Sequence, residues 1–395
     1  MVHKMKTLFA RIYQKILYIF TKFIKFREPI ILNELSEVVD VLKKENKKNI
    51  LLLSGKRVCK EEFYIYLFNL LKDNFKVLDY NEIPSDPDIE SIEKAVTISK
   101  DFNVDAIISI GGGSTMDAGK VVAARLTNKK SIRQMRGLLK ITKKPIFMIC
   151  IPTTCGTGSE CTVASVVTDL KRNEKYAISD PKLIPQYAVL DPRVLLTLPK
   201  DLIATTALDA LTHGVEAYIG KSNTYETYLY ARRAIYKIIY NVETAYNNKK
   251  DLNSRELLQQ ASYEAGIAFT KAYVGYVHAF SHAISAYYHL PHGYLNGILL
   301  PIILEAYGKS ANKKLIDLNH EVCINSNNPN DFIKKIKDLL VKLDIENNLC
   351  DIIKDEDIPK MIKHIKKEVY PLYPVPRYFS DEELLNIFNK IRNIA

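Results

Sequence analysis

The stretch Asp105-Ala-Ile-Ile-Ser-Ile-Gly-Gly-Gly-Ser114 joins an apolar run of strand length to a glycine-rich turn. Other apolar runs of strand length occur at 49–54, 75–79 and 145–151. Helical segments lie between these runs, near 60–72, 89–102 and 115–126. Strands that are apolar throughout and alternate with helices are typical of a parallel sheet covered by helices on both faces. We therefore expect a Rossmann-like α/β domain of the doubly wound kind over residues 29–194.

Two polar loops follow strands of this predicted sheet. Gly111, Gly112, Gly113 and Ser114 open a helix, where a backbone without side chains can approach a ligand and free N–H groups attract phosphate. Such a turn also occurs without a ligand. A second loop, 153–160, offers four hydroxyl groups and two glycines after the next strand. Because ligands bind at the carboxyl ends of parallel strands, the pair of loops indicates a dinucleotide.

Helical periodicity dominates from about residue 195 onward. The expected helices are 201–219, 224–247, 254–271, 273–288, 296–308, 330–343, 357–367 and 381–393. This change of pattern predicts an all-α carboxyl-terminal domain over 195–395, after the α/β domain and an amino-terminal arm of residues 1–28.

The predicted helical domain contains a group of candidate metal ligands. Asp209 and His213 are spaced i,i+4, as are His278 and His282, so each pair lies on one helix face. His292 follows a proline, which would end a helix and fix the direction of the next side chain. A carboxylate with three imidazoles suits Fe(II) or Zn(II) better than calcium. A lone histidine on a helix is more often a packed or surface residue, so spacing alone leaves both interpretations open.

Composition and charge narrow the class of protein. The chain has 395 residues, 47% of them hydrophobic, and a formal charge of +11. Seven Lys or Arg and no acidic residue lie within 1–27, so the remaining chain carries only +4 and shows no basic cluster typical of nucleic-acid binding. No apolar run is long enough to cross a membrane. Six cysteines without a regular framework, and the absence of a secretory signal pattern, predict reduced thiols and a cytoplasmic protein.

The amino-terminal arm has the pattern of a basic amphipathic helix. Its apolar positions are Leu8, Phe9, Ile12, Ile16, Ile19, Phe20, Phe23 and Ile24, and the basic positions between them are Arg11, Lys15, Lys22 and Lys25. One hypothesis is that residues 1–27 make a peripheral contact with an anionic membrane or a partner helix. The alternative is that the arm packs on its own protein or on a sister subunit.

Four motifs in order resemble the iron-containing (group III) alcohol dehydrogenase family. They are Gly-Gly-Gly-Ser-Thr-Met-Asp-Ala-Gly-Lys (111–120), Pro-Thr-Thr-Cys-Gly-Thr-Gly-Ser-Glu (152–160), Asp-Ala-Leu-Thr-His (209–213) and the stretch from His278 through His292 to Pro301. The likeness runs from about residue 29 to the carboxyl terminus. It implies a two-domain fold similar to that of dehydroquinate synthase, and a homodimer.

The resemblance also implies roles for single residues. Asp209, His213, His278 and His292 match the metal ligands, whereas His282 matches a further active-site histidine that is not a ligand. The positions that match cofactor-binding residues are Gly112, Gly113, Ser114, Asp117, Thr153, Thr154, Thr157 and Lys175, with Gly111 beginning the first loop.

The chain departs from the family pattern after its first long strand. Many NAD-using members carry Asp there, where the carboxylate binds the adenosine ribose and repels a 2′-phosphate, but this chain has Gly55 followed by Lys56 and Arg57. Glycine removes the repulsion, and the basic side chains could pair with a phosphate. We therefore expect NADP(H) rather than NAD(H). A smaller departure is Asp86, where relatives often have Asn.

The resemblance implies reversible hydride transfer between nicotinamide and an alcohol carbon in a cleft between the domains, with Fe²⁺ or Zn²⁺ polarising the substrate oxygen. His282 would relay the proton, because imidazole titrates near neutral pH. The segment around the histidines contains aromatic residues and no cluster of Lys or Arg, which favours a small uncharged alcohol or aldehyde. The alternatives are a lyase resembling dehydroquinate synthase, which would need basic residues for an anionic substrate, and a membrane-associated protein without activity.

Overall fold

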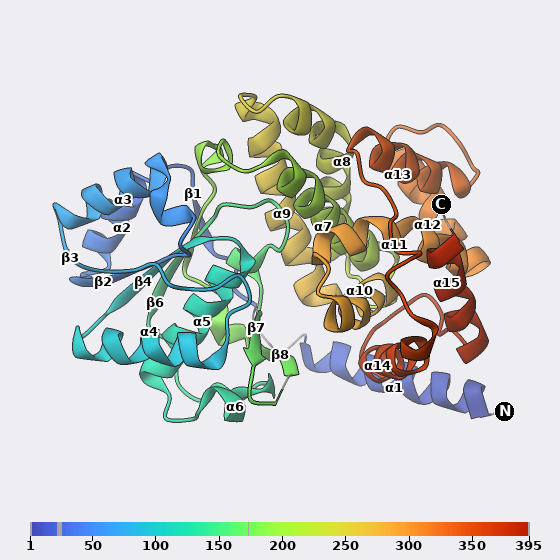
Figure 1. The fold of residues 1–395 in the computed structure, drawn as a ribbon, viewed down its shortest axis with the longest axis horizontal. Coiled ribbons are helices and arrows are strands. Elements are labelled where there is room, and N and C mark those ends of the chain that lie inside the picture. Colours follow the sequence, from blue (N-terminus) through green and yellow to red (C-terminus); the bar gives the residue numbers. More distant parts are fainter. Residues whose placement is uncertain (1, 22–25, 173, 394–395) are drawn as a thin grey trace. The chain divides into compact units, whose positions relative to one another are not determined.

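The computed structural model describes residues 2–21, 26–172 and 174–393, which belong to two compact units (Figure 1). The strand-rich unit comprises Lys25–Pro199 and Lys249–Gly266, and the helical unit comprises Met1–Ile24, Lys200–Asn248 and Ile267–Ala395. The strand-rich unit thus includes residues 249–266, which lie beyond the predicted 29–194.

A six-stranded sheet forms the centre of the strand-rich unit. Its order is β1 (Ile30–Leu32), β9 (Tyr187–Val189), β6 (Phe147–Pro152), β4 (Ala106–Gly111), β2 (Asn49–Leu53) and β3 (Lys76–Tyr80). All of the neighbouring strands pair in parallel, which confirms the predicted sheet. Gly111 at the end of β4 pairs with Pro152 at the end of β6, so the two polar loops leave the sheet side by side.

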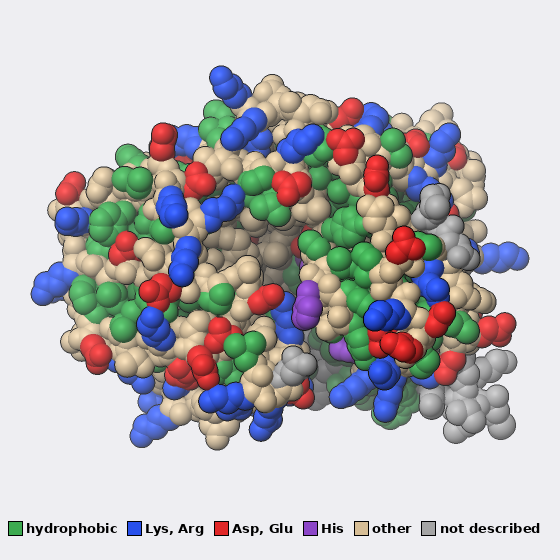
Figure 2. Space-filling model, viewed as in Figure 1, with side chains coloured by type: hydrophobic (Ala, Val, Ile, Leu, Met, Phe, Trp, Pro, Cys, Tyr) green, Lys and Arg blue, Asp and Glu red, His purple; other side chains and the backbone are tan. Residues whose placement is uncertain are grey.

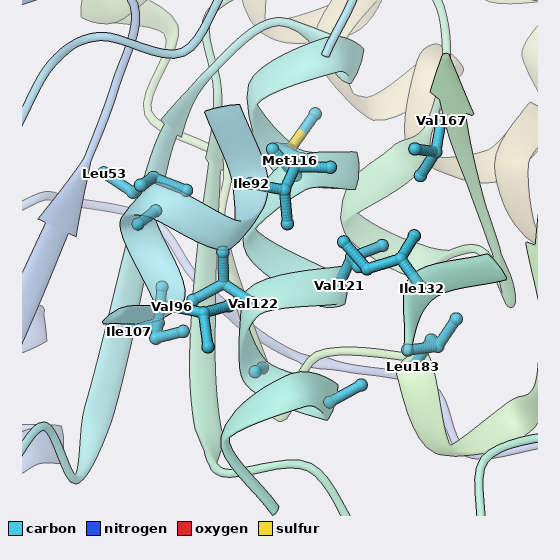
Figure 3. Packing of buried hydrophobic residues seen from close by; sticks show 14 of the residues in the cluster. Leu53, Ile92, Val96, Ile107, Met116, Val121, Val122, Ile132, Val167 and Leu183 are labelled. Atoms are coloured by element: carbon cyan, nitrogen blue, oxygen red, sulfur yellow. The ribbon is translucent and has the colours of Figure 1, made fainter. Parts of the chain in front are cut away.

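Helices of this unit cover the sheet and hold the first loop in place. They are α2 (Glu37–Lys44), α3 (Glu62–Lys72), α4 (Ile89–Asp101), α5 (Gly113–Thr127) and the short α6 (Ile132–Met135). Figure 3 shows side chains of α5 packed between α4 and the sheet; Met116 and Val122 of α5 and Ile92 and Val96 of α4 are almost fully buried. This core fixes the helix that begins at the glycine turn.

A smaller sheet is built around a hairpin. β7 (Ala164–Asp169) and β8 (Glu174–Ser179) are antiparallel, and β5 (Gly137–Leu138) pairs with β8 in parallel. Residue 173, at the turn, lies outside the described residues.

The helical unit confirms the predicted all-α part of the chain. Its helices are α1 (Val2–Thr21), α7 (Lys200–Ile219), α8 (Tyr225–Asn247), α10 (Tyr276–Tyr288), α11 (His292–Tyr307), α12 (Asn312–Glu321), α13 (Asn330–Lys342), α14 (Ile358–Val369) and α15 (Asp381–Asn393). One of the chain's passages between the units falls within α9 (Leu252–Ala272). Of the predicted arm, Lys22, Phe23, Ile24 and Lys25 lie outside the described residues, as do the side chains of Ile19 and Phe20.

Charged side chains of both signs are interspersed over the face drawn in Figure 2, with no large basic patch there. Among the described residues, no helix combines the length and the apolar character that a membrane span requires.

Candidate functional site

Three of the predicted ligands meet within the helical unit. Single ligand atoms of Asp209, His278 and His292 lie within 4.8 Å of one another. Oδ1 of Asp209 is 3.8 Å from Nε2 of His278 and 3.5 Å from Nε2 of His292. The carboxylate comes from the middle of α7, and the imidazoles come from the first turns of α10 and α11.

Pro291 determines how His292 enters the group. The proline precedes the first residue of α11, so His292 begins that helix, four residues before the predicted start at 296. α11 also lies very close to α7: a Cβ added to Gly293 would be 2.2 Å from the carbonyl oxygen of Thr205. Glycine at 293 therefore allows the approach that brings His292 to Asp209.

His213, the fourth predicted ligand, lies beside the other three. Its ring stacks on Phe269, with centroids 4.1 Å apart, and on His278, with centroids 4.5 Å apart. Its Nδ1 is 3.9 Å from Oδ1 of Asp209. The ring thus contacts the group without contributing an atom to the set that converges, and its role as a ligand stays a prediction.

Hydrogen bonds at Nδ1 orient two of the imidazoles. Nδ1 of His278 lies 2.6 Å from the carboxylate of Glu216, which also accepts from the backbone N–H groups of Gly275 and Val277 at the start of α10. Nδ1 of His292 lies 2.9 Å from the hydroxyl of Ser281. Partners at Nδ1 favour the tautomer that leaves Nε2 as the acceptor, as in histidines that bind metal ions.

Burial keeps His278 neutral. Removal from water lowers the pKa of His278 well below its ordinary value, and the neighbouring His213 and His292 lower it further. Burial also raises the pKa of Glu216 to about 7, although its backbone hydrogen bonds oppose this rise. A neutral imidazole is the form that binds a metal ion.

The donor set fits a divalent cation. The amide nitrogen of Asn296 is 2.7 Å from Oδ1 of Asp209, 3.0 Å from Nε2 of His292 and 3.3 Å from Nε2 of His278. These acceptor atoms thus converge on one donor group. Borderline nitrogen ligands with one carboxylate match Fe(II) and Zn(II).

His282 stands at the edge of the group and has a partner of its own. It is partly exposed, its ring stacks on that of His292 at 5.0 Å, and its Nδ1 lies 2.7 Å from a carboxylate oxygen of Glu368 in α14. Tyr373 donates to the same carboxylate at 2.7 Å. Burial acts to raise the pKa of Glu368, but His282 and Tyr373 outweigh it and leave the pKa below its ordinary value.

The predicted cofactor loops contact each other within the strand-rich unit. A Cβ on Gly112 would touch the methyl group of Thr154 at 3.4 Å, and one on Gly113 would collide with Thr157 at 2.6 Å. The N–H of Thr153 donates to the carbonyl of Gly111 at 2.9 Å. The predicted residues of both loops thus lie together, with the backbone of the glycine turn against the threonines.

Asp117 holds the second loop and the hairpin to α5. Its two carboxylate oxygens accept from the hydroxyl of Ser159 at 2.6 Å and from the N–H of Val166 at 2.8 Å. Both oxygens therefore have partners within the protein, which supports a role in ordering the loops.

Three other predicted positions lie around the glycine turn or near it. The hydroxyl of Ser114 donates to the carbonyl of Ser85. Lys175 is exposed and forms a 2.6 Å ion pair with Asp86, which follows Ser85 in the chain. Gly55 follows β2, where a Cβ would lie 3.1 Å from the carbonyl of Ile83 and 4.0 Å from the hydroxyl of Thr115 in α5.

Sequence reasoning did not find Glu216, Ser281, Asn296 or Glu368. Glu216 and Asn296 lie on the same helix faces as proposed ligands, at i+7 from Asp209 and i+4 from His292, so the helical period could have indicated them. Glu368 is distant in sequence from His282, and no local pattern links the two.

Comparisons with known proteins agree with this arrangement. Residues 30–192 match the family described as iron-containing alcohol dehydrogenase, and residues 203–392 match the carboxyl-terminal part of the Fe-containing alcohol dehydrogenase family. The chain is 31% identical over 360 residues to alcohol dehydrogenase 4 of Saccharomyces cerevisiae, covering 90% of this chain and 94% of that protein. The solved structure of an alcohol dehydrogenase from Oenococcus oeni superposes with a TM-score of 0.89 at 27% identity, covering 93% of this chain and 99% of that one.

Relatives are named for both nicotinamide cofactors. An NAD-dependent methanol dehydrogenase of Bacillus methanolicus is 34% identical over 233 residues, covering 59% of this chain and 61% of that protein. An NADPH-dependent butanol dehydrogenase of Clostridium saccharobutylicum is 29% identical over 319 residues, covering 80% and 81%. These names leave the cofactor of the present chain open.

Proposed function

The chain belongs to the iron-containing alcohol dehydrogenase family, and from this premise we propose that it interconverts a small uncharged alcohol and its carbonyl compound with NADP(H). The observation that carries this proposal is the convergence of Asp209, His278 and His292, with Glu216 and Ser281 orienting the two imidazoles.

Asp209, His213, His278 and His292 would hold the metal ion. A divalent cation bound there would supply a Lewis acid for the substrate oxygen. The helices contribute the geometry: α7 positions the carboxylate, and the Nδ1 hydrogen bonds direct Nε2 of His278 and His292 toward it.

The two loops of the strand-rich unit would bind the cofactor, which supplies or accepts the hydride. In this proposal the N–H groups at the start of α5 and the hydroxyls of Thr153, Thr154 and Thr157 bind the pyrophosphate and the nicotinamide ribose. Gly55 leaves the adenosine ribose without a carboxylate partner, and the exposed Lys56 and Arg57 follow it. These features support NADP(H).

His282 would move the proton between the substrate oxygen and solvent. Because Nδ1 bonds Glu368, the transfer would use Nε2. Partial exposure gives the ring access to water, and contact with His292 places it beside the proposed metal ligands. A positioned imidazole contributes typically about 10²–10⁴-fold to such steps.

The substrate class follows from what surrounds the histidines. Residues 272–308, which include both α10 and the proposed ligand His292, contain no Lys or Arg. Phe269 stacks on His213, whereas Tyr276 and Phe280 are buried in the core of the unit. The residue types near the site therefore suit an uncharged substrate better than a carboxylate or phosphate.

One experiment tests the proposal. The purified protein should oxidise NADPH with a panel of short aldehydes and should contain iron or zinc by metal analysis. Asp209→Ala should remove both the metal and the activity, whereas His320→Ala, a change of an exposed histidine in α12, should remove neither. Metal-loaded protein that reduces no member of the panel would contradict the proposed substrate class.

A further inference from the structure

Helix α1 has one face that packs on its own protein. Ala10 is fully buried and Gln14 is 9% exposed. The amide of Gln14 donates to the carbonyls of Pro371 and Tyr373, each at 2.8 Å. The guanidinium of Arg11 donates to the carbonyl of Val375 at 2.6 Å. These bonds hold α1 against the segment after α14, beside which it lies in Figure 1.

The opposite face of α1 is apolar and exposed. Leu8, Phe9, Ile12 and Ile16 have exposed fractions between 48% and 62%. Their spacing places them on one stripe, because residues three and four positions apart share a helix face. The docked residues Ala10 and Gln14 do not belong to this stripe, which we call the outer face of α1.

Packing on the helical unit does not explain this outer face. A surface helix ordinarily presents polar side chains to water, and a contiguous exposed apolar patch marks a site of association. The docked face alone accounts for Ala10, Arg11 and Gln14. Phe9 has a tilted ring contact with Tyr370, with centroids 6.5 Å apart, but its side chain stays 57% exposed. The contacts of α1 within the protein therefore leave most of this apolar surface uncovered.

Charge identifies the chemistry of that partner. Within α1 the basic residues are Lys4, Lys6, Arg11 and Lys15, and the helix has no acidic residue. An anionic surface attracts such a segment, whereas a second copy of the same segment repels it. Apolar side chains flanked by basic ones are the pattern of helices that lie in the interface of an anionic bilayer.

We propose that the outer face of α1 binds the surface of an anionic phospholipid bilayer. The helix lies in the plane of the interface, with Leu8, Phe9, Ile12 and Ile16 among the lipid chains and basic side chains at the headgroups. The bonds of Arg11 and Gln14 to residues 371–375 attach the helical unit to the bound helix. This proposal concerns a surface and is independent of the reaction that the enzyme catalyses.

Co-sedimentation with vesicles tests the proposal. The full-length protein should bind vesicles that contain phosphatidylglycerol. Its affinity for vesicles of phosphatidylcholine alone should be about tenfold lower. Salt at about 0.5 M should weaken the binding, because it screens the basic residues. The triple variant Leu8→Gln, Ile12→Gln, Ile16→Gln should bind anionic vesicles with an affinity lower by about tenfold or more.

A matched variant distinguishes lipid binding by the outer face from non-specific binding through any exposed apolar side chain. Val341→Gln with Leu385→Gln removes two exposed apolar side chains from α13 and α15 of the same unit, and should bind vesicles as the unchanged protein does. Circular dichroism and dehydrogenase activity should be the same for all three proteins, since the outer face takes no part in catalysis.

Three results would refute the proposal: no binding of the unchanged protein to anionic vesicles, equal binding by the triple variant, or equal binding to neutral vesicles. A triple variant that dissociates into smaller assemblies while its lipid binding stays unchanged would show that a second copy of the chain covers the outer face instead.

Discussion

Position 55 holds a glycine at the place where we propose that the adenosine ribose binds. We predict that Gly55→Asp lowers the ratio of kcat/KM for NADPH to kcat/KM for NADH by about tenfold, because a carboxylate there would repel a 2′-phosphate and bind the ribose hydroxyls. The measurement is steady-state kinetics with both cofactors.

Gly55→Ala is the control for this change. It introduces the same Cβ, 3.1 Å from the carbonyl of Ile83, without a charge. If the alanine variant lowers the ratio as much as the aspartate variant does, crowding rather than charge explains the effect.

Glu368 is predicted to position His282 for proton transfer. Glu368→Leu removes the acceptor at Nδ1, so the ring can turn and its tautomer is no longer fixed. We expect kcat to fall about tenfold, with KM and metal content nearly unchanged, and Glu368→Gln, which keeps an acceptor, to restore most of the loss. A merely structural role predicts instead that both variants lose stability and metal together.

Glu160 makes stability depend on pH. Burial raises the pKa of this glutamate to about 7, although a backbone hydrogen bond within Glu160 and the charge of Lys120 oppose the rise. Among the described residues, its carboxylate oxygens form no hydrogen bond with another side chain. Because the folded protein holds the proton more tightly than the unfolded chain, the carboxyl group favours folding at low pH. This contribution is lost as the pH rises through about 7.

Denaturant unfolding at about pH 5 and about pH 8 measures the effect of Glu160. The unfolding free energy of the unchanged protein should decline over this interval by about 2–3 kcal/mol relative to that of Glu160→Gln. Glu256→Gln, which alters an exposed glutamate of α9, should follow the unchanged protein. Parallel pH profiles for the unchanged protein and Glu160→Gln would show that Glu160 is not the source.

The site residues that could be predicted from sequence are those at helical spacing from another candidate or within a recognisable motif. Asp209, His278 and His292 share helix faces or follow a proline, and the structure brings them together. The partners that orient them were missed: helical spacing places Glu216 on the face of Asp209, but that spacing does not show that its carboxylate contacts His278 on another helix. Glu368 reaches His282 from 86 residues away, and only the tertiary structure shows that pair.

At the level of elements, the close crossing of α7 and α11 brings the proposed ligands Asp209 and His292 together. Gly293→Ala would place a Cβ within 2.2 Å of a backbone carbonyl of α7, and backbone cannot give way as a side chain can. We therefore expect α11 to shift together with His292, and metal affinity to fall about tenfold or more. Metal analysis after dialysis against a weak chelator measures this.

Gly297→Ala on the same helix is the matched control. Its Cβ would meet a methyl group of Leu208 at 2.8 Å, and a flexible side chain end can move. Metal content should stay near that of the unchanged protein. Equal losses from both variants would mean that α11 tolerates no added methyl group, and the crossing at Gly293 would have no special role.

Helices and strands with a long sequence pattern could also be predicted, whereas short elements and contacts between distant segments could not. The long strands and helices were predicted because their apolar periods extend over several residues. The three-residue strands β1 and β9 were missed, since such short runs carry no period, and polar α12 was missed because its sequence resembles a loop. The docking of α1 on residues 371–378 depends on contacts between segments more than 350 residues apart, which no local pattern encodes.

For the whole molecule, the proposed ligands and the proposed cofactor residues belong to different compact units. Asp209, His213, His278 and His292 lie in the helical unit, and both polar loops lie in the strand-rich unit. Each unit has its own core, so the two binding functions should be separable. Removal of the metal should therefore affect one and spare the other.

Treatment with a chelator tests this separation. Activity should vanish and the melting temperature of the helical unit should fall, because a metal ion at 100 times its Kd stabilises the folded state by about 2.7 kcal/mol. NADPH affinity, measured by fluorescence, should change by less than about threefold. Asp209→Asn should melt at the lower temperature with or without chelator, since it lacks the carboxylate that the ion needs. A chelated protein that no longer binds NADPH would show instead that the metal site and the cofactor loops form one cooperative structure.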